Sequence, residues 1–264
     1  MTVDFTAALA GAPPTRAQLR AHLVEARLAG DIATPRDNNL RAMRRLADRD
    51  ERSWFGLRPD VGYPFSQVLR VMVERVGVHP DPAYRTGGDH IDPERTLDAL
   101  AQMGKRLRRA ARKSERVFIA TGHPAGVFAI HVVLAGALAA AGCEVLTPSA
   151  GAVFDFGDGN FELRYVHGVA MLSSGGELKH SHSAVPMKRL LADGLDAQLV
   201  IADHGWAGAA GQAGYDVVCF ADCNDPALFV GAQEGHITAT VPIDDNVLPH
   251  LYEPVSAYLL GQLG

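Results

Sequence analysis

Cysteine is scarce in this chain of 264 residues, which contains Cys143, Cys219 and Cys223 and no others. The number is odd, and each thiol lies in or beside a predicted strand, so the sequence gives no indication of a disulfide framework. Buried, unpaired cysteines are typical of proteins in a reducing compartment. We therefore expect a cytoplasmic protein without disulfides.

The chain also lacks the patterns of export and membrane insertion. Its amino terminus, MTVDFTAALAGAPP, has no basic region ahead of an apolar run and does not resemble a secretory signal. One window, residues 125–143, approaches the length of a membrane span. It is rich in Ala and Gly, contains His131 and follows a predicted strand, which favours a buried crossover helix. No membrane partner is expected.

Positive charge is scarce in the second part of the chain. Residues 1–116 contain 21 of the 25 Lys and Arg and 15 of the 30 acids, whereas residues 117–264 contain 4 and 15, with 8 of the 11 His. An acidic, His-rich region suits divalent cations, and an Arg-rich region could neutralise an anionic substrate or simply be solvated. The run KRLRRAARK at 105–113 has no interleaved aromatic residue, so nucleic acid is not expected as a partner.

Both common nucleotide-binding motifs are absent. The segment TGHPAG at 121–126 opens a predicted helix, but it is neither GxGxxG nor GxxxxGK[ST], and no acid closes the next predicted strand. A dinucleotide or P-loop function is therefore disfavoured. Free amides at this helix start, around Gly122, could still bind a phosphate or carboxylate, unless the segment is only a structural turn.

The first part of the chain is predicted to be helical. The expected helices are 15–29, 38–47, 64–76 and 93–113. The last of these begins at Pro93 and ends in cations that suit the helix dipole. Residues 48–63 break the periodicity and predict a loop with Trp54 and Phe55 packed down. The polar segment 84–93 predicts either a lid over a site or a surface turn.

From residue 116 onwards, short apolar runs alternate with helical segments. The expected strands are 116–121, 143–147, 152–156, 160–166, 168–173, 198–202, 216–221 and 237–241. The expected helices are 127–141, 184–193 and 247–261. Right-handed crossovers then give an α/β fold with a predominantly parallel, Rossmann-like three-layer sheet and an N-terminal helical segment. We expect residues 1–115 to pack on an α/β domain at 116–264 that carries the site.

Polar clusters follow five of these strands directly. The carboxyl ends of parallel strands lie at one edge of a sheet, so the clusters are expected to line a single rim, where α/β proteins bind ligands. The clusters are Thr121-Gly122-His123, Ser173-Ser174-Gly175-Gly176, Asp203-His204, Asp222-Cys223-Asn224-Asp225 and Asp244-Asp245-Asn246.

Several carboxylates on one rim would repel one another unless a cation neutralised them. We predict a divalent ion held by Asp203, Asp222 and Asn224, together with His180 and His182. The two histidines are two residues apart, and on an extended segment this spacing points both rings the same way. An oxygen-rich set suits Mg²⁺ or Mn²⁺ better than Zn²⁺.

Other roles are open for some of these residues. Asp225 precedes Pro226, a pattern that favours helix capping, and Asp244 and Asp245 could be caps or ligands. Two surface histidines at this spacing can also lack any role. Cys223 is not predicted to be a nucleophile, because no base for it is evident.

Four segments of the chain resemble an actinobacterial-type phosphatase family: TGHPAG, HSHS, IADHGWAGAAGQAGYDVVCFADCNDPAL and PIDDNVLPHLYEPVSAYLL. The similarity extends over most of the chain, including GGDHIDPERTL, and implies phosphatase activity without naming a substrate. The acids at strand ends are also distantly similar to metal-dependent damage-control phosphatases of sugar phosphates. Those have an Asp-Asn pair where this chain has Asp203-His204.

These observations predict a metal-dependent phosphatase acting on a small phosphomonoester such as a sugar phosphate. His123 or His204 would serve as acid or base beside Asp203. The groups expected to neutralise the phosphoryl oxygens are Gly122, Ser173, Ser174, Gly175 and Lys188. No phosphoaspartate is predicted, because a DxDx[TV] loop is absent. The alternatives are a non-catalytic protein that binds a phosphorylated metabolite or a metal, and a metal-dependent lyase or transferase. A homo-oligomer is compatible with the sequence.

Overall fold

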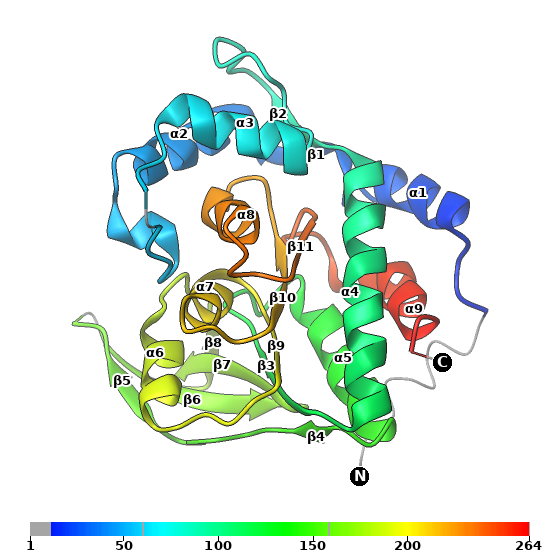
Figure 1. Ribbon diagram of the computed structural model, residues 1–264, viewed down its shortest axis with the longest axis vertical. Helices are drawn as coiled ribbons and strands as arrows, with labels where there is room; N and C mark the ends of the chain where they lie inside the picture. The colour runs from blue at the N-terminus through cyan, green and yellow to red at the C-terminus, as the bar shows by residue number, and fades with distance from the viewer. Residues whose placement is uncertain (1–11, 60, 158, 264) are drawn as a thin grey trace.

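The protein is built around a mixed β-sheet, seen in a computed structural model that describes residues 12–59, 61–157 and 159–263 (Figure 1). The strand order is β11-β10-β9-β3-β7-β6-β5, with β4 beside β3 and β8 beside β7. The strands are β3 (Arg116–Ala120), β4 (Glu144–Val145), β5 (Val153–Asp155), β6 (Asn160–Val166), β7 (Val169–Ser174), β8 (Glu177–Lys179), β9 (Leu199–Ala202), β10 (Val217–Ala221) and β11 (Ala239–Pro242).

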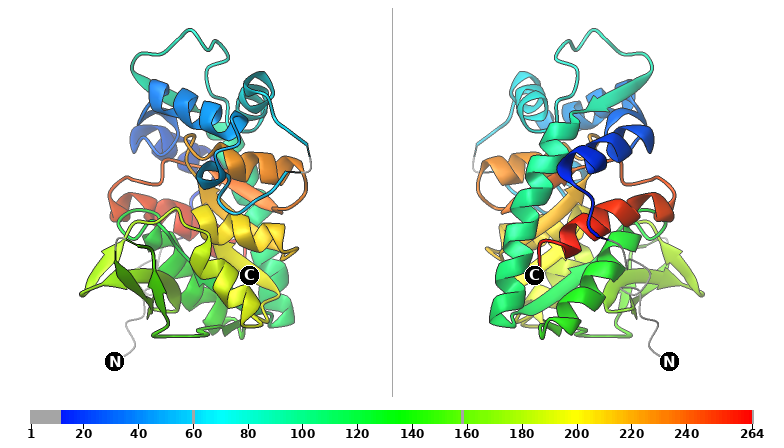
Figure 2. Two further views of the ribbon diagram at one scale, coloured as in Figure 1. Left: turned by 90° about the vertical axis from the view of Figure 1, so that its left-hand side faces the viewer. Right: turned by 90° about the vertical axis from the view of Figure 1, so that its right-hand side faces the viewer.

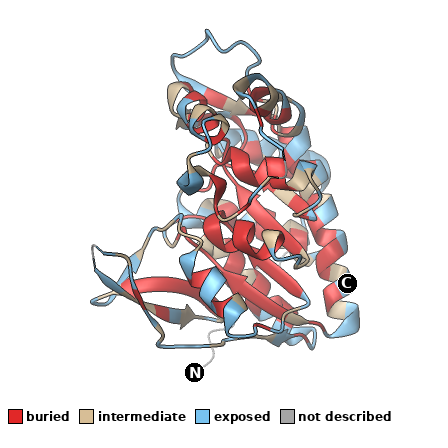
Figure 3. Ribbon diagram, turned by 60° about the vertical axis from the view of Figure 1, so that its left-hand side comes forward, coloured by how far each residue is buried: buried red, intermediate tan, exposed pale blue. Residues whose placement is uncertain are grey.

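Most strand pairs are parallel, as the sequence predicted. Strands β11, β10, β9, β3, β4 and β7 pair in parallel, and β5, β6 and β8 add antiparallel pairs at one side. The runs LVIA of β9 and VVCFA of β10 are buried at every position. Strands with no polar alternation are those covered on both faces (Figure 3).

The crossovers between strands explain how the sheet is covered. They contain α5 (Phe128–Ala140), α6 (Val185–Ala192), α7 (His204–Gln212) and α8 (Pro226–Gln233). From β9 the chain moves towards β11, and from β3 it moves the opposite way to β4. Right-handed crossovers therefore place α7 and α8 on the face opposite α5. The direction reverses between β3 and β9, and ligands bind at the carboxyl ends of strands beside such a reversal.

The N-terminal region is helical, with one small sheet. It comprises α1 (Arg16–Glu25), β1 (Gly30–Pro35), α2 (Arg36–Ala47), the 3-10 helix η2 (Glu51–Trp54), α3 (Phe65–Arg75), β2 (Gly88–Ile91) and α4 (Pro93–Lys113). The antiparallel pair β1-β2 was not predicted. Helices α2 and α3 pack on α8, and α4 packs on β11 and α5 (Figures 1 and 2).

The segment 84–93 is attached to α2. Arg85 pairs with Asp37, and buried Asp89 pairs with Arg36. Ahead of β2 the chain forms a loop that projects beyond α2 and α3, away from the main sheet (Figure 2). These contacts anchor the polar segment to the N-terminal region.

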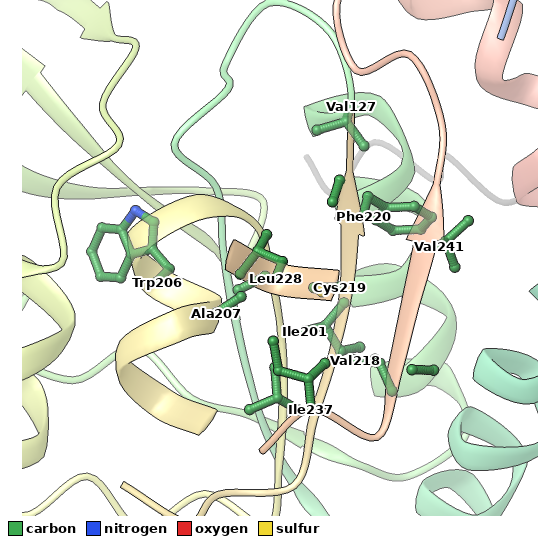
Figure 4. Close-up of a cluster of buried hydrophobic side chains, with 14 of the residues drawn as sticks. Val127, Ile201, Trp206, Ala207, Val218, Cys219, Phe220, Leu228, Ile237 and Val241 are labelled. Atoms are coloured by element: carbon green, nitrogen blue, oxygen red, sulfur yellow. The ribbon is translucent and has the colours of Figure 1, made fainter. Parts of the chain in front are cut away.

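Buried apolar side chains form a continuous core that includes both the N-terminal region and the sheet. Figure 4 shows part of this core, formed by side chains of α7, α8 and the sheet that include Ala207, Leu228, Ile201 and Phe220. The chain closes with the 3-10 helix η3 (Pro249–Tyr252) and α9 (Glu253–Leu260), which packs on α4 and α5. All three cysteines are free and buried. Among the described residues, no helix has the length and apolar character of a membrane span.

Candidate active site

The segment that carries His180 and His182 is held by backbone contacts at the carboxyl ends of β3 and β9. The Ser181 amide donates to the Gly122 carbonyl at 2.8 Å. A Cβ atom on Gly122 would lie 2.1 Å from the Ser181 carbonyl oxygen, so only glycine fits here. On this extended segment the two imidazoles point the same way, and their Nε2 atoms are 2.9 Å apart.

His204 lies at the centre of the site, at the first position of α7. Its ring stacks on His182 with centroids 4.1 Å apart. Nδ1 is 3.3 Å from Asp203, and Nε2 is 3.3 Å from Asp225 and 3.5 Å from Asp245. Its φ of 42° is unusual for a residue with a side chain, and such strain is found mainly at functional sites.

The three carboxylates around His204 control its charge. Burial opposes protonation, but Asp225, Asp203 and Asp245 together raise the pKa of His204 well above its usual value. In the protein without a bound cation, His204 is therefore the positive charge that these acids share.

Asp203 connects the end of β9 to the end of β3. One carboxylate oxygen accepts from the Thr121 hydroxyl, and the other accepts from the Gly122 amide at 2.6 Å. Burial raises the pKa of Asp203. The interactions with His204 and the Thr121 hydroxyl lower it by a larger amount, so the net shift of the pKa is downwards. The Gly122 amide, which was predicted to bind phosphate, is thus engaged by Asp203, and each Asp203 oxygen already accepts a hydrogen bond.

Three further acids meet beyond His204, at the ends of β10 and β11. Asp222 accepts from the Thr34 hydroxyl of β1 at 2.6 Å, and it lies close to Asp244 and Asp245. Burial, followed by the charges of Asp245 and Asp244, raises the pKa of Asp222 well above its usual value. Burial likewise raises the pKa of Asp244. The nearby positive charge is therefore not enough to offset the burial and mutual repulsion of these carboxylates.

Asp225 does not have the capping role that the sequence favoured. It occupies the N-cap position of α8, followed by Pro226, but its side chain makes no capping hydrogen bond. The residue is 1% exposed, and neither carboxylate oxygen has a hydrogen-bond partner among the described residues. Its carboxylate faces His204 instead. A buried charge in this state is costly unless an ion neutralises it.

Three overlapping groups of these side chains could hold a metal ion, and within each group the ligand atoms lie within 4.8 Å of one another. The groups are His180, His182 and His204; His204, Asp225 and Asp245; and Asp222, Asp244 and Asp245. Such clusters are consistent with the divalent cation that the sequence predicted. Asn224, also predicted as a ligand, lies between two of these acids in the chain and is partly exposed.

His123 borders the cluster. Its ring centroid is 4.5 Å from that of His180, and its Nε2 is 3.7 Å from Asp245. The side chain is almost buried, and Nδ1 has no hydrogen-bond partner among the described residues. A buried ring nitrogen without a partner is a polar atom that the described structure leaves unsatisfied.

A cleft of about 980 Å³ adjoins the histidines. Residues 180–185 and Lys188 form one wall, and residues of the 49–63 segment, including Arg49, Arg52 and Arg58, form another. The predicted phosphate ligand Lys188 therefore shares this cleft with His180 and His182. The predicted residues Ser173, Ser174 and Gly175 are not among the residues that line it. Ser173 and Ser174 belong to the β7-β8 hairpin, and Gly175 lies in its turn.

Comparison with known proteins identifies the family. A model of the family described as Phosphatase matches residues 14–264. The chain belongs to this family. It is also 48% identical, over 265 residues, to a protein of Streptomyces coelicolor named Phosphatase SCO2771, with 95% of this chain and 97% of that protein covered. The resemblance noted in the sequence is thereby confirmed, and both names support phosphatase activity.

Sequence reasoning missed one wall residue of this phosphatase. Phe55 is packed down, as predicted, and its ring also lies edge-on to His182 and His204, with centroids 5.4 and 5.6 Å away. Phe55 has a φ of 52°, and its backbone lies close to α7. A Cβ atom on Gly208 of α7 would be 2.3 Å from the Phe55 carbonyl oxygen. The only signal in the sequence was an aromatic pair in an aperiodic loop.

Proposed function

We propose that the protein is a metal-dependent phosphatase that hydrolyses a small phosphomonoester. The observation that carries this proposal is the carboxylate of Asp225, which is buried beside His204 and receives no hydrogen bond from any described residue. Asp222, Asp244 and Asp245 crowd the same space. One imidazolium leaves three of these four buried carboxylates unbalanced, and a divalent cation would neutralise two more.

The ligand set favours an ion that can be bound by both imidazole and carboxylate groups. His180 and His182, at the cleft, would bind an ion together with acids from the ends of β10 and β11. Mg²⁺ and Mn²⁺ suit the carboxylates, and the three clustered imidazoles make Mn²⁺ the better match of the two. When bound, such an ion polarises a phosphoryl group and lowers the pKa of a water molecule.

The other residues would orient the substrate and handle protons. Hydrolysis needs a proton on the departing ester oxygen and removes one from the attacking water. His123 is placed beside the cluster for this exchange, because its ring contacts His180 and its Nε2 is 3.7 Å from Asp245. Asp203 would position the Gly122 loop and the His204 ring rather than bind the ion. Lys188 would neutralise phosphoryl oxygens in the cleft.

The strand order and the free cysteines are consistent with the proposed phosphatase. A reversal of strand direction beside β3 and β9, with helices over the sheet, fits a Rossmann-like three-layer arrangement with its site at the switch point. Free, buried cysteines fit a cytoplasmic protein. The division into an N-terminal region at 1–115 and an α/β region at 116–264 is part of this proposal.

The test is phosphate release from a panel of phosphomonoesters by chelator-treated protein, with Mg²⁺, Mn²⁺ or Zn²⁺ added back. We expect turnover only with metal, and little turnover by Asp225→Ala. Turnover that ignores chelator would exclude the metal role. Ligand-induced thermal stabilisation without turnover would favour a binding protein, and organic products other than the free alcohol would favour a lyase or transferase.

A further inference from the structure

The metal-ligating cluster contains more side chains than one ion uses. The three overlapping groups together comprise seven residues: His180, His182, His204, Asp222, Asp225, Asp244 and Asp245. Zn²⁺ in proteins takes four ligands, and Mg²⁺ keeps several waters and binds one or two carboxylates. Seven convergent ligand side chains are therefore a surplus for a single ion.

The two ends of the cluster share no residue and differ in chemistry. One end is made of the imidazoles of His180, His182 and His204, two of which line the cleft. The other end is made of the buried carboxylates of Asp222, Asp244 and Asp245. Imidazole ligands suit transition metals such as Mn²⁺ and Zn²⁺, whereas an all-carboxylate set suits Mg²⁺ or Mn²⁺.

Asp225 lies between the two ends. It forms the middle group with His204, which belongs to the imidazole end, and with Asp245, which belongs to the carboxylate end. Both of its oxygens lack a hydrogen-bond partner among the described residues. A carboxylate with two free oxygens can bind one ion with each.

Among the described residues, the two buried acids that lie outside the candidate site are paired with arginine, whereas the acids of this cluster are not. Asp89 bonds Arg36 at 2.8 Å, and Glu115 bonds Arg106 at 2.6 Å. Asp225 and Asp245 have only histidine partners among the described ion pairs. The protein therefore has arginines available for buried carboxylates, but none of those described pairs with an acid of this cluster.

We infer that the site holds two divalent ions, one at the His180, His182 and His204 end and one at the Asp222, Asp244 and Asp245 end, with Asp225 between them. This inference rests on the metal dependence of the proposed function. Two ions would also suit the chemistry, because paired ions stabilise both the attacking and the departing oxygen of a phosphoryl transfer.

The experiment counts ions on the full chain without substrate. Chelator-treated protein is titrated with Mn²⁺ by calorimetry, and bound metal is measured after gel filtration. We expect two ions per wild-type chain. We expect one in His182→Ala, which disrupts only the imidazole end, and one in Asp244→Asn, which disrupts only the carboxylate end. The matched controls are His90→Gln and Glu162→Gln, which change exposed residues and should retain two.

A second measurement needs no variant. Two Mn²⁺ ions that share Asp225 give an exchange-coupled electron paramagnetic resonance spectrum, whereas isolated ions give a six-line signal. Saturation of the wild type at one ion, or an uncoupled spectrum at full loading, overturns the inference. Two bound ions in a protein that hydrolyses no phosphomonoester would overturn the proposed function and leave the two-ion site standing.

Discussion

The Nε2 atoms of His180 and His182 face each other at 2.9 Å, beside the cleft. Burial, followed by the neighbouring His204 and His180, lowers the pKa of His182 to about 3. Burial and the nearby imidazoles also lower the pKa of His180. Both rings are therefore neutral near pH 7, which is the form that binds a metal. The two imidazoles are thus already in the protonation state that the proposed metal site requires.

Replacing His182 with alanine should remove one arm of this pair. We expect kcat/KM for metal-activated phosphate release to fall by about 100-fold or more, since changes even to groups behind the ligands cost 10–100-fold. Far-ultraviolet circular dichroism should be unchanged. His90→Gln is the control, because the His90 side chain is 44% exposed and its described ion pair is with Asp31 in the β1-β2 sheet. Equal losses in both variants would contradict a ligand role for His182.

Asp225→Asn should have opposite effects on stability with and without metal. Without metal it removes a buried charge that lacks a hydrogen-bond donor. We expect a gain of about 1–2 kcal/mol, or roughly 2–6 °C in Tm. With saturating Mn²⁺ the variant should gain less from metal than the wild type does. Thermal unfolding in chelator and in Mn²⁺ measures both. Asp48→Asn, at the exposed end of α2, is the control and should change neither.

Phe55→Leu should weaken metal binding without unfolding the protein. The change keeps an apolar side chain but removes the ring that lies edge-on to His182 and His204. We expect Mn²⁺ affinity to fall by about 10-fold, as for groups that orient metal ligands. Calorimetric titration measures this affinity. Phe65→Leu is the control, because Phe65 packs under Arg44 in the N-terminal region. An unchanged Kd in Phe55→Leu would show that the ring does not position the histidines.

The cleft should favour substrates with a second anionic group. Arg49 and Arg52 line it and pair with no described carboxylate within 4.0 Å. For a doubly anionic ester, such as a sugar bisphosphate, Arg49→Gln with Arg52→Gln should raise KM by about 10–100-fold. KM for a singly anionic ester should change little. The matched control is Arg41→Gln with Arg45→Gln, outside the cleft on α2. Parallel loss on both esters would point to a structural effect instead.

His131 should make stability dependent on pH. It is fully buried in α5, its Nδ1 contacts the Val127 carbonyl, and burial lowers its pKa. The unfolded chain therefore binds a proton more readily than the folded one. Stability is therefore lost as pH falls below the unfolded value of about 6.5.

The His131→Leu variant checks this prediction by urea unfolding in chelator at pH 7.5 and pH 5. It should lose less stability than the wild type between those pH values. An identical decline in both proteins would assign the acid sensitivity to other groups.

The strands of the main sheet were predictable because burial left a direct trace in the sequence. Residues 198–202 and 216–221 were predicted, and β9 and β10 occupy Leu199–Ala202 and Val217–Ala221. Both runs are entirely apolar, as two-sided burial requires. Strands β1, β2 and β8 were not predicted, because their sequences GDIATP, GDHI and ELK contain no continuous apolar run.

The site was predictable as a rim but not as a set of contacts. The strand-end rule brought His123, Asp203 and Asp222 to one edge, because parallel strands end together. It could not show that the Asp225 carboxylate turns away from its own helix, since Asp-Pro is equally good as a cap. It also could not show that the two carboxylate oxygens of Asp203 accept hydrogen bonds from Thr121 and Gly122. Both outcomes depend on side-chain rotamers and on neighbours distant in sequence.

The contact between Ser181 and Gly122 has a consequence for how the protein matures. The histidine segment lies on the β3 turn, while the acids arrive with the later strands β10 and β11. In a growing polypeptide the three imidazoles can meet once β9 and α7 have formed, whereas the carboxylate end needs Asp244 and Asp245, which follow β11. Metal binding at the carboxylate end would thus report completed folding, and an indicator dye could time that event during refolding.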